Sequence, residues 1–381
     1  MGNSFVCPRC GNSDPRYLGK RNGVTYCRKC ISFRGEDVKG GEERPKNVIL
    51  SLGYRLSEEQ ERLSKAIIEN FDNGIDTLVY AVCGSGKTEI SYGIIARSMA
   101  KGLRVGFALP RRDVVIELFY RLKDAFPSNR VVAVYGGNTA RLEGDCIILT
   151  THQLYRYPNY FDLLVMDEID AFPFKGNDVL IAMYKRSLKG HCVMMSATPS
   201  EAIKREFKQP GHAILELHTR FHKQPIPVPK TVIRPPLFRF LFVIRRLLKY
   251  QWEGKPCLIF VPTVEKAFEL FREISLLVKG GDYVSSKRAG REEVIDAFKK
   301  GKTAYLVTTA VLERGVTVRN VQVIIYGADE KIYDSAALIQ IAGRVGRKKG
   351  ATVGDVFFLA KKESKSMRKA IREIEFCNTF L

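Results

Sequence analysis

A glycine-rich run followed by lysine and threonine is the first feature of this sequence that could do chemistry. The run reads Ala81-Val-Cys-Gly84-Ser85-Gly86-Lys87-Thr88. An apolar stretch precedes it and a helical pattern follows it, which is the context that a phosphate-binding loop requires. Glycines let the backbone wrap around phosphate oxygens, and a helix N-terminus adds partial positive charge. We therefore expect a nucleotide site in which Lys87 reaches the β- and γ-phosphates and Thr88 offers its hydroxyl to Mg²⁺.

Acidic residues about eighty positions further on could complete that site. The apolar run Leu163–Met166 ends in Asp167-Glu168-Ile169-Asp170. A strand that delivers carboxylates beside bound phosphates suits metal-assisted hydrolysis. We expect Asp167 to hold Mg²⁺, directly or through water, and Glu168 to polarise the attacking water. Asp170 is expected to link the site to neighbouring motifs.

A glutamine upstream of the phosphate loop has two interpretations. The run Leu56-Ser57-Glu58-Glu59-Gln60 opens a helical pattern at Ser57. Serine followed three residues later by glutamine is the signature of a capping box, which is a structural role. The functional alternative is that Gln60 binds the adenine edge of the nucleotide. The sequence leaves both interpretations open.

Four cysteines near the N-terminus have the spacing of a metal site. Two residues lie between Cys7 and Cys10, and sixteen residues separate Cys10 from the second pair, Cys27 and Cys30. This C-x2-C-x16-C-x2-C pattern is typical of zinc, and four thiolates make a closed, structural site. Two disulfides or an iron site of the rubredoxin type are the alternatives. In a segment with so little apolar material, the metal would supply folding free energy.

The elements that must position these residues follow an alternating pattern. Apolar runs typical of buried parallel strands alternate with helical patterns, which predicts doubly wound α/β architecture. The predicted strands of the first domain are Thr77–Val82, Val105–Leu109, Val131–Tyr135, Cys146–Thr150, Leu163–Met166 and Val193–Met195. Those of the second are Leu258–Val261, Tyr305–Thr308, Val323–Tyr326 and Val356–Leu359.

Three domains follow from this pattern. Residues 1–45 form the zinc-binding module, residues 46–225 the first α/β domain, and residues 226–381 the second. Residues 219–237 are rich in proline and poor in periodicity, so we interpret them as an interdomain linker. A chain of 381 residues is too long for one typical core, which agrees with several domains.

Charge and hydropathy narrow the class of partner. The net charge of +21 is spread along the chain and predicts a polyanion partner, either nucleic acid or an anionic membrane surface. No apolar run reaches the roughly 18 residues that a membrane-spanning helix needs, and no apolar signal-peptide core is present. The five cysteines outside the first 45 residues are scattered, which is typical of a reducing cytosol.

Several motifs together resemble those of superfamily-two helicases and translocases over about 300 residues. They are the phosphate loop, DEID, the triplet Ser196-Ala197-Thr198, the run Thr308–Thr317 (TTAVLERGVT), and Gln340–Arg347 (QIAGRVGR). With DEIDAF, TTHQLYR and the four-cysteine module, the chain resembles the ComFA family of competence ATPases over nearly its whole length. The chain departs from that family at Ile169, where valine is frequent, and in its short N-terminal segment.

The resemblance implies a fold, an activity and a setting. The fold is two tandem RecA-like domains with parallel sheets behind a zinc module. The activity is ATP hydrolysis that depends on single-stranded DNA and drives DNA import in natural transformation, with ATP, Mg²⁺ and structural Zn²⁺. Its partners would include other competence proteins and the inner-membrane DNA channel. We expect a cytoplasmic location, with peripheral association at the inner face of the membrane and oligomerisation as open alternatives.

The resemblance also assigns roles in the second domain. Arg344 and Arg347 would be arginine fingers that neutralise charge on the γ-phosphate, and Gln340 would bind the nucleotide. A solvated basic helix, or contacts with DNA phosphates, are the alternatives for the two arginines. Arg314 and Gly315 would bridge ATP and nucleic acid, although Gly315 could serve only a turn.

Strand ends supply candidates for contact with nucleic acid. Thr309 belongs to the TTAVLERGVT run, and the others follow two strands of the first domain: Arg111, Arg112, Thr150, His152 and Gln153. A surface salt bridge is the alternative for the two arginines. Motors of this class grip phosphates and sugars, so we expect little base specificity and strong salt dependence.

Three functions remain distinct at this point. The first is a translocase on single-stranded DNA, and the second is a duplex-unwinding helicase of replication restart or repair. The third is a zinc-dependent nucleic-acid-binding protein without motor activity. Intact Lys87, Glu168 and Arg347 argue against the third. The absence of a large insertion that could split strands favours the first over the second.

Overall fold

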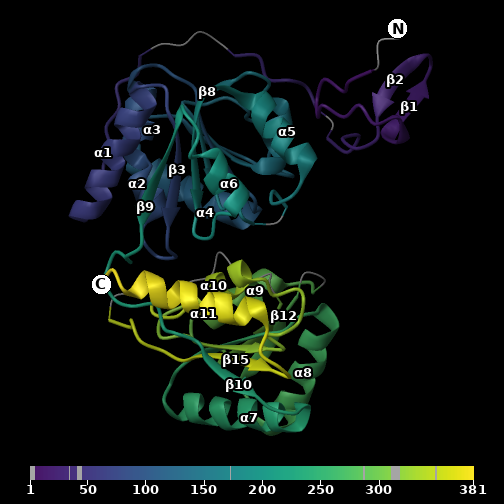
Figure 1. Cartoon of the computed structure of the whole chain (residues 1–381), viewed down its shortest axis with the longest axis vertical. Helices are drawn as coiled ribbons and strands as arrows, with labels where there is room; N and C mark the ends of the chain where they lie inside the picture. Colours follow the sequence, from purple (N-terminus) through teal and green to yellow (C-terminus); the bar gives the residue numbers. More distant parts are fainter. Residues whose placement is uncertain are drawn as a thin grey trace. The chain divides into compact units, whose positions relative to one another are not determined.

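The chain groups into two compact units. The first comprises Met1–Ala81 and Gly86–Leu217, and the second comprises Val82–Ser85 and His218–Leu381 (Figure 1). The computed structural model describes residues 5–33, 35–40, 45–171, 173–285, 288–309, 318–347 and 350–381. No helix among these residues is both long and apolar enough to cross a membrane.

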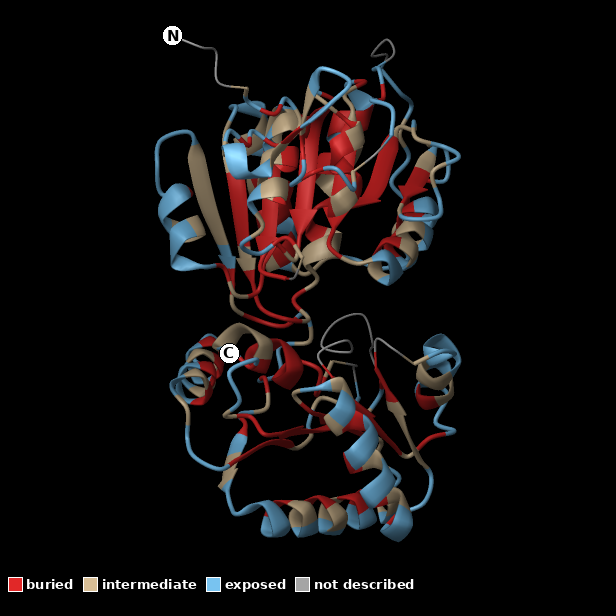
Figure 2. Cartoon of the chain, turned by 90° about the vertical axis from the view of Figure 1, so that its right-hand side faces the viewer, coloured by how far each residue is buried: buried red, intermediate tan, exposed pale blue. Residues whose placement is uncertain are grey.

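The first unit is built on a seven-stranded parallel sheet of order β5-β6-β4-β7-β8-β3-β9. Its strands are β3 (Asp76–Ala81), β4 (Val105–Leu109), β5 (Val131–Val134), β6 (Cys146–Thr150), β7 (Phe161–Asp167), β8 (Leu188–Ser196) and β9 (His212–Leu217). Residues of β4, β6 and β7 are buried without interruption, as expected for strands covered on both faces. In Figure 2 the central strands of this sheet have the colour of buried residues.

Helices cover both faces of the first sheet. The elements are α1 (Glu58–Asp72), α2 (Lys87–Ile90), α3 (Tyr92–Ala100), α4 (Arg112–Ala125), the 3-10 helix η2 (Thr151–Arg156), α5 (Asp178–Ser187) and α6 (Glu201–Glu206). Leu63 of α1 and Leu118 of α4 pack with Val79 on one face. Leu154 of η2 and Leu180 of α5 pack with Leu78 on the other. The neighbouring residues Leu78 and Val79 serve opposite faces because side chains alternate along a strand.

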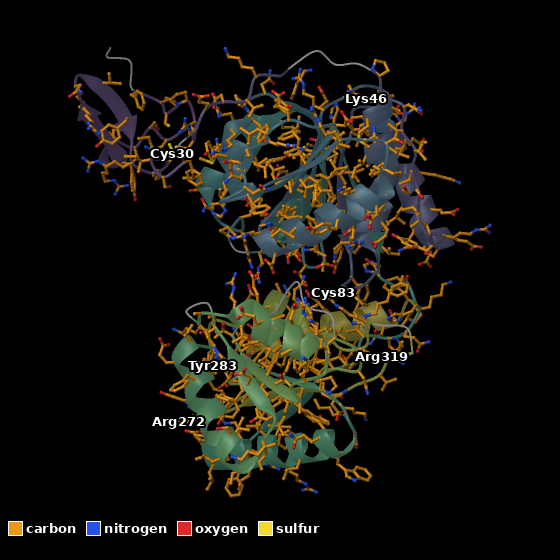
Figure 3. The ribbon with its side chains drawn as sticks, turned by 180° about the vertical axis from the view of Figure 1, so that it is seen from behind. Cys30, Lys46, Cys83, Arg272, Tyr283 and Arg319 are labelled. Carbon is orange, nitrogen blue, oxygen red and sulfur yellow. The ribbon has the colours of Figure 1, made fainter. Side chains whose placement is uncertain are left out.

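The four-cysteine module belongs to the first unit. It contains the 3-10 helix η1 (Pro15–Tyr17) and an antiparallel hairpin of β1 (Leu18–Arg21) and β2 (Val24–Cys27). All four cysteines are buried, and they join the same apolar cluster as η2 and α5. Figure 3 labels Cys30 within this module.

The second unit is built on a six-stranded parallel sheet of order β10-β15-β14-β11-β13-β12. Its strands are β10 (Lys230–Ile233), β11 (Cys257–Phe260), β12 (Gly281–Val284), β13 (Tyr305–Thr308), β14 (Gln322–Tyr326) and β15 (Val356–Ala360). Helices α7 (Pro236–Trp252) and α8 (Val264–Leu277) pack on one face. Helices α9 (Arg291–Lys299), α10 (Ser335–Ala342) and α11 (Lys365–Asn378) pack on the other.

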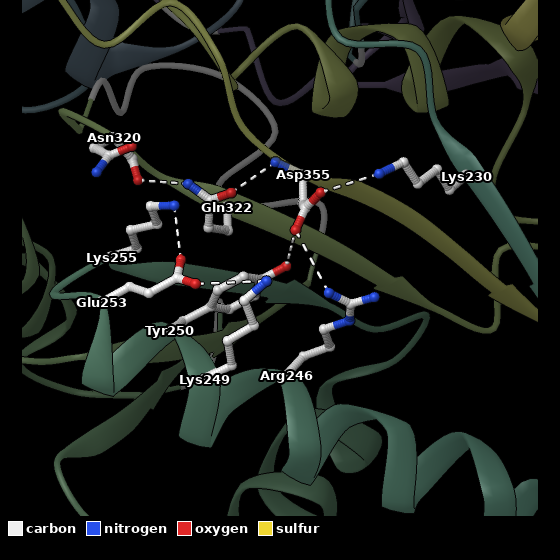
Figure 4. A network of polar contacts seen from close by, with 9 residues as sticks. All are labelled: Lys230, Arg246, Lys249, Tyr250, Glu253, Lys255, Asn320, Gln322 and Asp355. Carbon is white, nitrogen blue, oxygen red and sulfur yellow. Dashed lines mark hydrogen bonds and ion pairs between the residues drawn. The ribbon is translucent and has the colours of Figure 1, made fainter.

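A polar network lies where β14 and β15 begin (Figure 4). Asp355 accepts a hydrogen bond of 2.9 Å from the hydroxyl of Tyr250 and pairs with Lys230 and Arg246. Burial alone would raise the pKa of this carboxyl, but these partners together lower it below its usual value. The Asp355 amide also donates to Gln322 Oε1 at 2.6 Å. The network therefore fixes the register at which β15 enters the sheet.

The predicted strands are found in both units, and one sequence interpretation is wrong. Residues 219–237 are not wholly a linker, because Lys230–Ile233 forms β10, which pairs with β15 at the edge of the second sheet. Helix α7 already begins at Pro236. Four residues between prolines carry too short a pattern to stand out, and an edge strand tolerates prolines that a central strand would not. Strands β9 and β12 were also missed.

Candidate nucleotide site and motor motifs

The predicted motifs of the first unit gather at one edge of its sheet. All seven strands are parallel, so their carboxyl ends meet at that edge, where ligands of open α/β sheets bind. Strand β3 leads into the phosphate loop, β7 ends at Asp167, and β8 ends at Ser196. Since β8 lies between β3 and β7, the Ser196 triplet stands between the loop and the acids.

The phosphate loop has the backbone that its glycines allow. Gly84 and Gly86 have φ values of 84° and 80°, which other residues rarely adopt. Lys87 Nζ donates to the carbonyl of Ala81 at 3.0 Å, so the lysine lies across its own loop. This arrangement matches a loop shaped to surround phosphate oxygens.

Gln60 takes the structural role and also lies against the loop. The side-chain Oε1 of Gln60 accepts from the backbone amide of Ser57 at 2.9 Å, and the backbone amide of Gln60 donates to Ser57 Oγ at 3.3 Å. These two hydrogen bonds confirm the capping box. A Cβ built on Gly86 would stand 2.2 Å from Gln60 Nε2. The capping box thus holds the glutamine amide group beside the phosphate loop, and the two interpretations of Gln60 are compatible.

The acidic strand end is buried and locally strained. Asp167 is 9% exposed, and its Oδ1 accepts from the Glu168 amide at 2.7 Å. Glu168 has a φ of 58°, a left-handed conformation that is unusual for glutamate and that tends to occur at functional sites. Asp170 accepts hydrogen bonds from Ser196 at 2.9 Å and Thr198 at 2.6 Å. The expected link between the DEID and Ser-Ala-Thr motifs is therefore confirmed.

The candidates for nucleic-acid contact occupy different surroundings. Arg111 precedes α4, and the Arg112 guanidinium stacks over the Tyr135 ring at 5.0 Å. Thr150 is buried at the end of β6. Gln153 is also buried, and its Oε1 accepts from the Arg156 side chain at 2.8 Å.

His152 lies against the four-cysteine module. Its ring stacks on Phe33 with centroids 6.0 Å apart and an interplanar angle of 19°. Burial lowers the pKa of His152, which favours the neutral ring for such a contact. Phe33 also packs edge-on against Tyr155, and the amide of Val38 donates to the Arg156 carbonyl at 2.6 Å. The module is thus docked on η2, and no spacing in the sequence indicated Phe33 as the docking residue.

The four cysteines have the geometry of a metal site. Their sulfur atoms all lie within 4.8 Å of one another, with 3.5 Å between Cys7 and Cys30 and 3.7 Å between Cys10 and Cys27. Zinc–sulfur bonds of about 2.3 Å in a tetrahedron imply sulfurs about 3.8 Å apart. A disulfide bond is only about 2.05 Å long, so this arrangement excludes the two-disulfide alternative.

In the second unit, the two predicted arginines follow α10. Arg344 is 1% exposed, whereas Arg347 is half-buried and its Nε donates to the Gly343 carbonyl at 2.9 Å. Gln340 is buried, and its Oε1 accepts from the Cys83 thiol at 2.9 Å.

The remaining candidates of the second unit follow β13. Thr309 is buried directly after that strand. Arg314 and Gly315 lie outside the described residues.

Comparison with known proteins defines the class of enzyme. Residues 59–205 match the DEAD/DEAH box helicase family, and residues 241–349 match the helicase conserved C-terminal domain. Together with the two RecA-like units, these matches make the chain an ATP-dependent nucleic-acid helicase or translocase that uses ATP and Mg²⁺.

Two relatives define the family more narrowly. Competence protein ComFA of Bacillus subtilis is 35% identical over 402 residues, covering 98% of this chain and 86% of the relative. Its counterpart in Streptococcus pneumoniae is 32% identical, covering 98% and 90%. The chain belongs to the ComFA family.

Solved structures support the fold. Dbp5 of S. cerevisiae bound to RNA and ADP BeF3 has a TM-score of 0.63 at 16% identity, covering 86% of this chain and 92% of that one. RecG bound to a three-way DNA junction has a TM-score of 0.59 at 20% identity, covering 86% and 45%. These similarities concern the two tandem RecA-like domains.

Proposed function

We propose that this protein hydrolyses ATP to move single-stranded DNA into the cytoplasm during bacterial natural transformation. The observation that carries the proposal is the edge of the first sheet, where the phosphate loop, Asp167 and Glu168 meet in a chain of the ComFA family. Each step would combine nucleotide binding, closure of the two domains, hydrolysis and release.

The first domain would bind the nucleotide and activate water. The loop Gly84–Thr88 would surround the phosphates, with Lys87 on the β- and γ-phosphates and Gln60 beside the loop. Thr88 and Asp167 would hold Mg²⁺, which neutralises phosphate charge when bound. Glu168 would orient the attacking water and accept its proton.

The second domain would supply positive charge during phosphoryl transfer. Arg347 is the more accessible of the two arginines, which supports its role as the finger that reaches the γ-phosphate. Arg344 is almost fully buried, which suits a residue that holds the loop of Arg347 in place and adds positive charge to it. Gln340 and Gly315 are proposed to contact the nucleotide from this domain.

DNA contacts would lie on the loops that follow the strands. We propose the following residues for them: Arg111, Arg112, Thr150, His152, Gln153, Thr309 and Arg314. Since the chain carries a net charge of +21, binding should be dominated by phosphates and should weaken steeply with salt. The four-cysteine module would hold structural Zn²⁺, and we propose domain limits near residues 45 and 225.

The setting is proposed to be the cytoplasmic face of the cell membrane, beside other competence proteins and the DNA channel. Helix α7 supports this, because it contains no acidic residue and exposes five apolar side chains: Leu237, Phe238, Leu241, Leu248 and Trp252. Trp252 is 88% exposed, and Arg245 and Lys249 are exposed on the same helix. Apolar side chains interleaved with cations are typical of a membrane-surface helix.

The deciding experiment separates translocation from unwinding. Purified protein should show ATPase activity that rises strongly with single-stranded DNA, and it should displace a bound protein roadblock from that strand. A forked duplex should remain largely unseparated under the same conditions. Efficient strand separation would instead support a duplex-unwinding helicase, and absence of DNA-stimulated hydrolysis would contradict both.

A further inference from the structure

Arg220 is a buried arginine that takes no part in the nucleotide or DNA contacts proposed above. It follows β9, the last strand of the first unit, in the segment that enters the second unit. Its side chain is 2% exposed, although arginine is rarely buried without a partner. Such a group must be held by specific hydrogen bonds.

Those hydrogen bonds all go to the loop that carries Arg344 and Arg347. Nη1 of Arg220 donates to the carbonyls of Val345 at 2.9 Å and Gly346 at 3.1 Å, and Nη2 donates to that of Gly343 at 3.2 Å. These carbonyls belong to the loop that directly follows α10, next to the helix end that carries partial negative charge. The last carbonyls of α10 itself accept from the backbone amides of Gly343, Arg344 and Val345. The guanidinium therefore holds three carbonyls of the arginine loop itself.

Two further contacts tighten the same arrangement. His222 Nε2 lies 2.9 Å from the Gly346 carbonyl, so two residues of one segment reach that group. Gly346 has a φ of 72°, and a Cβ there would stand 2.3 Å from the Thr352 carbonyl oxygen and 3.1 Å from Arg220 Nη1. The loop is consequently confined on both sides.

The surroundings of Arg220 disfavour its positive charge. Burial and the positive charge of Arg347 lower the pKa of Arg220 to about 10, which still leaves it protonated at neutral pH. Arg347 in turn donates to the Gly343 carbonyl, which also accepts from Arg220. The two side chains therefore share one acceptor, and a shift of Arg220 would act directly on Arg347.

We infer that Arg220 is a positioning residue that holds the arginine loop in its hydrolysis-competent geometry. The inference rests on the proposed function, because it concerns the loop that would supply the finger. Arg220 lies in the second unit, directly after the chain leaves the first at Leu217, so a change in the path of the backbone there would be transmitted to the loop. The connection between the units thereby becomes part of the catalytic arrangement.

The test is Arg220→Lys, with Arg220→Gln as a second variant that removes the buried charge. Lysine keeps the charge but lacks the planar fork that reaches three carbonyls. We expect kcat of the DNA-stimulated ATPase to fall on the order of 10- to 100-fold, while KM for ATP stays within about twofold. Amide hydrogen exchange of residues 341–347 should become faster in both variants.

Arg234→Lys is the matched control, because Arg234 is an exposed arginine further along the same segment. It should leave kcat and loop exchange unchanged. Assays run well below the melting temperature of the least stable variant.

A kcat within about twofold of the parent chain for Arg220→Lys would overturn the inference. So would equal losses of nucleotide binding and of kcat in both variants, because that outcome assigns Arg220 to stability alone. The proposed function fails separately, if the unaltered chain shows no DNA-stimulated hydrolysis.

Discussion

The two units share an architecture and differ in the chemistry of their loops. Each is a parallel sheet with helices on both faces, yet the first presents Asp167 and Glu168 after its strands and the second presents Arg344 and Arg347 after α10. In the first unit, strand β3 and helix α2 flank the glycine loop that can surround phosphates, whereas the second unit has a loop held by Arg220. One architecture thus carries two different sets of loop residues, and we propose that each set supplies one part of the reaction.

The largest expected effect concerns the acid of the first unit. Glu168→Gln should reduce DNA-stimulated ATP hydrolysis by about 10³-fold, because the amide cannot accept the proton of the attacking water. Binding of a fluorescent ATP analogue should be retained. Glu201→Gln, at the start of α6 in the same unit, is the control and should leave turnover unchanged. Full turnover in Glu168→Gln would remove the acid from the mechanism.

The second prediction concerns the arginine of the other unit. Arg347→Ala should lower kcat by about 10²-fold with nucleotide affinity nearly unchanged, since its charge would act mainly in the transition state. Stopped-flow binding beside single-turnover hydrolysis measures the two quantities separately. Lost binding with intact catalysis would contradict the finger role.

The third prediction concerns the four-cysteine module of the first unit. Cys27→Ser should abolish metal binding, with one zinc per chain in the parent protein and none in the variant by elemental analysis. The half-saturating concentration of single-stranded DNA should rise about tenfold, because the module packs on η2, which carries two of the proposed DNA contacts. Phe33 stacks on His152 there, and the Val38 amide donates to the Arg156 carbonyl. Cys377→Ser is the control, because this cysteine lies in the second unit. Unchanged DNA affinity in a metal-free variant would separate the module from the DNA-contact segment.

The smallest effect concerns the stability of the second unit. Asp355 has a lowered pKa in the folded chain, so its stabilisation is present above the unfolded value of 3.8 and is lost as pH falls through the folded pKa. Asp355→Asn should destabilise the second unit by about 1–2 kcal/mol at pH 7 and by less near pH 3. Urea unfolding followed by hydrogen exchange of β15 measures the difference. An equal loss at both pH values would show that the ionised carboxylate contributes nothing specific.

The sequence was most informative where residues lie close together along the chain. The phosphate loop, DEID and the cysteine pairs have fixed spacings that reflect local geometry, and the strands before them are continuous apolar runs. The capping box at Ser57 is likewise local, and the structure confirms it. Its second consequence, Gln60 against Gly86, depends on how α1 packs and has no sequence signal.

Contacts between distant segments could not be predicted in this way. Phe33 meets His152 across more than a hundred residues, and Arg220 reaches Val345 over a similar separation. An isolated phenylalanine or arginine carries no spacing that marks its partner. Strand β10 was missed for a related reason, because its pairing with β15 is what makes those four residues a strand.

The central claim is that an acid of the first unit and an arginine of the second act on one nucleotide. A double-mutant cycle on single-turnover ATP hydrolysis tests it most directly, with Glu168→Asp and Arg347→Lys chosen because both should leave measurable turnover. Residues that act in one transition state show non-additive losses, so the double variant should be little slower than the slower single variant. Losses that multiply across the two variants would show independent action and would contradict the account.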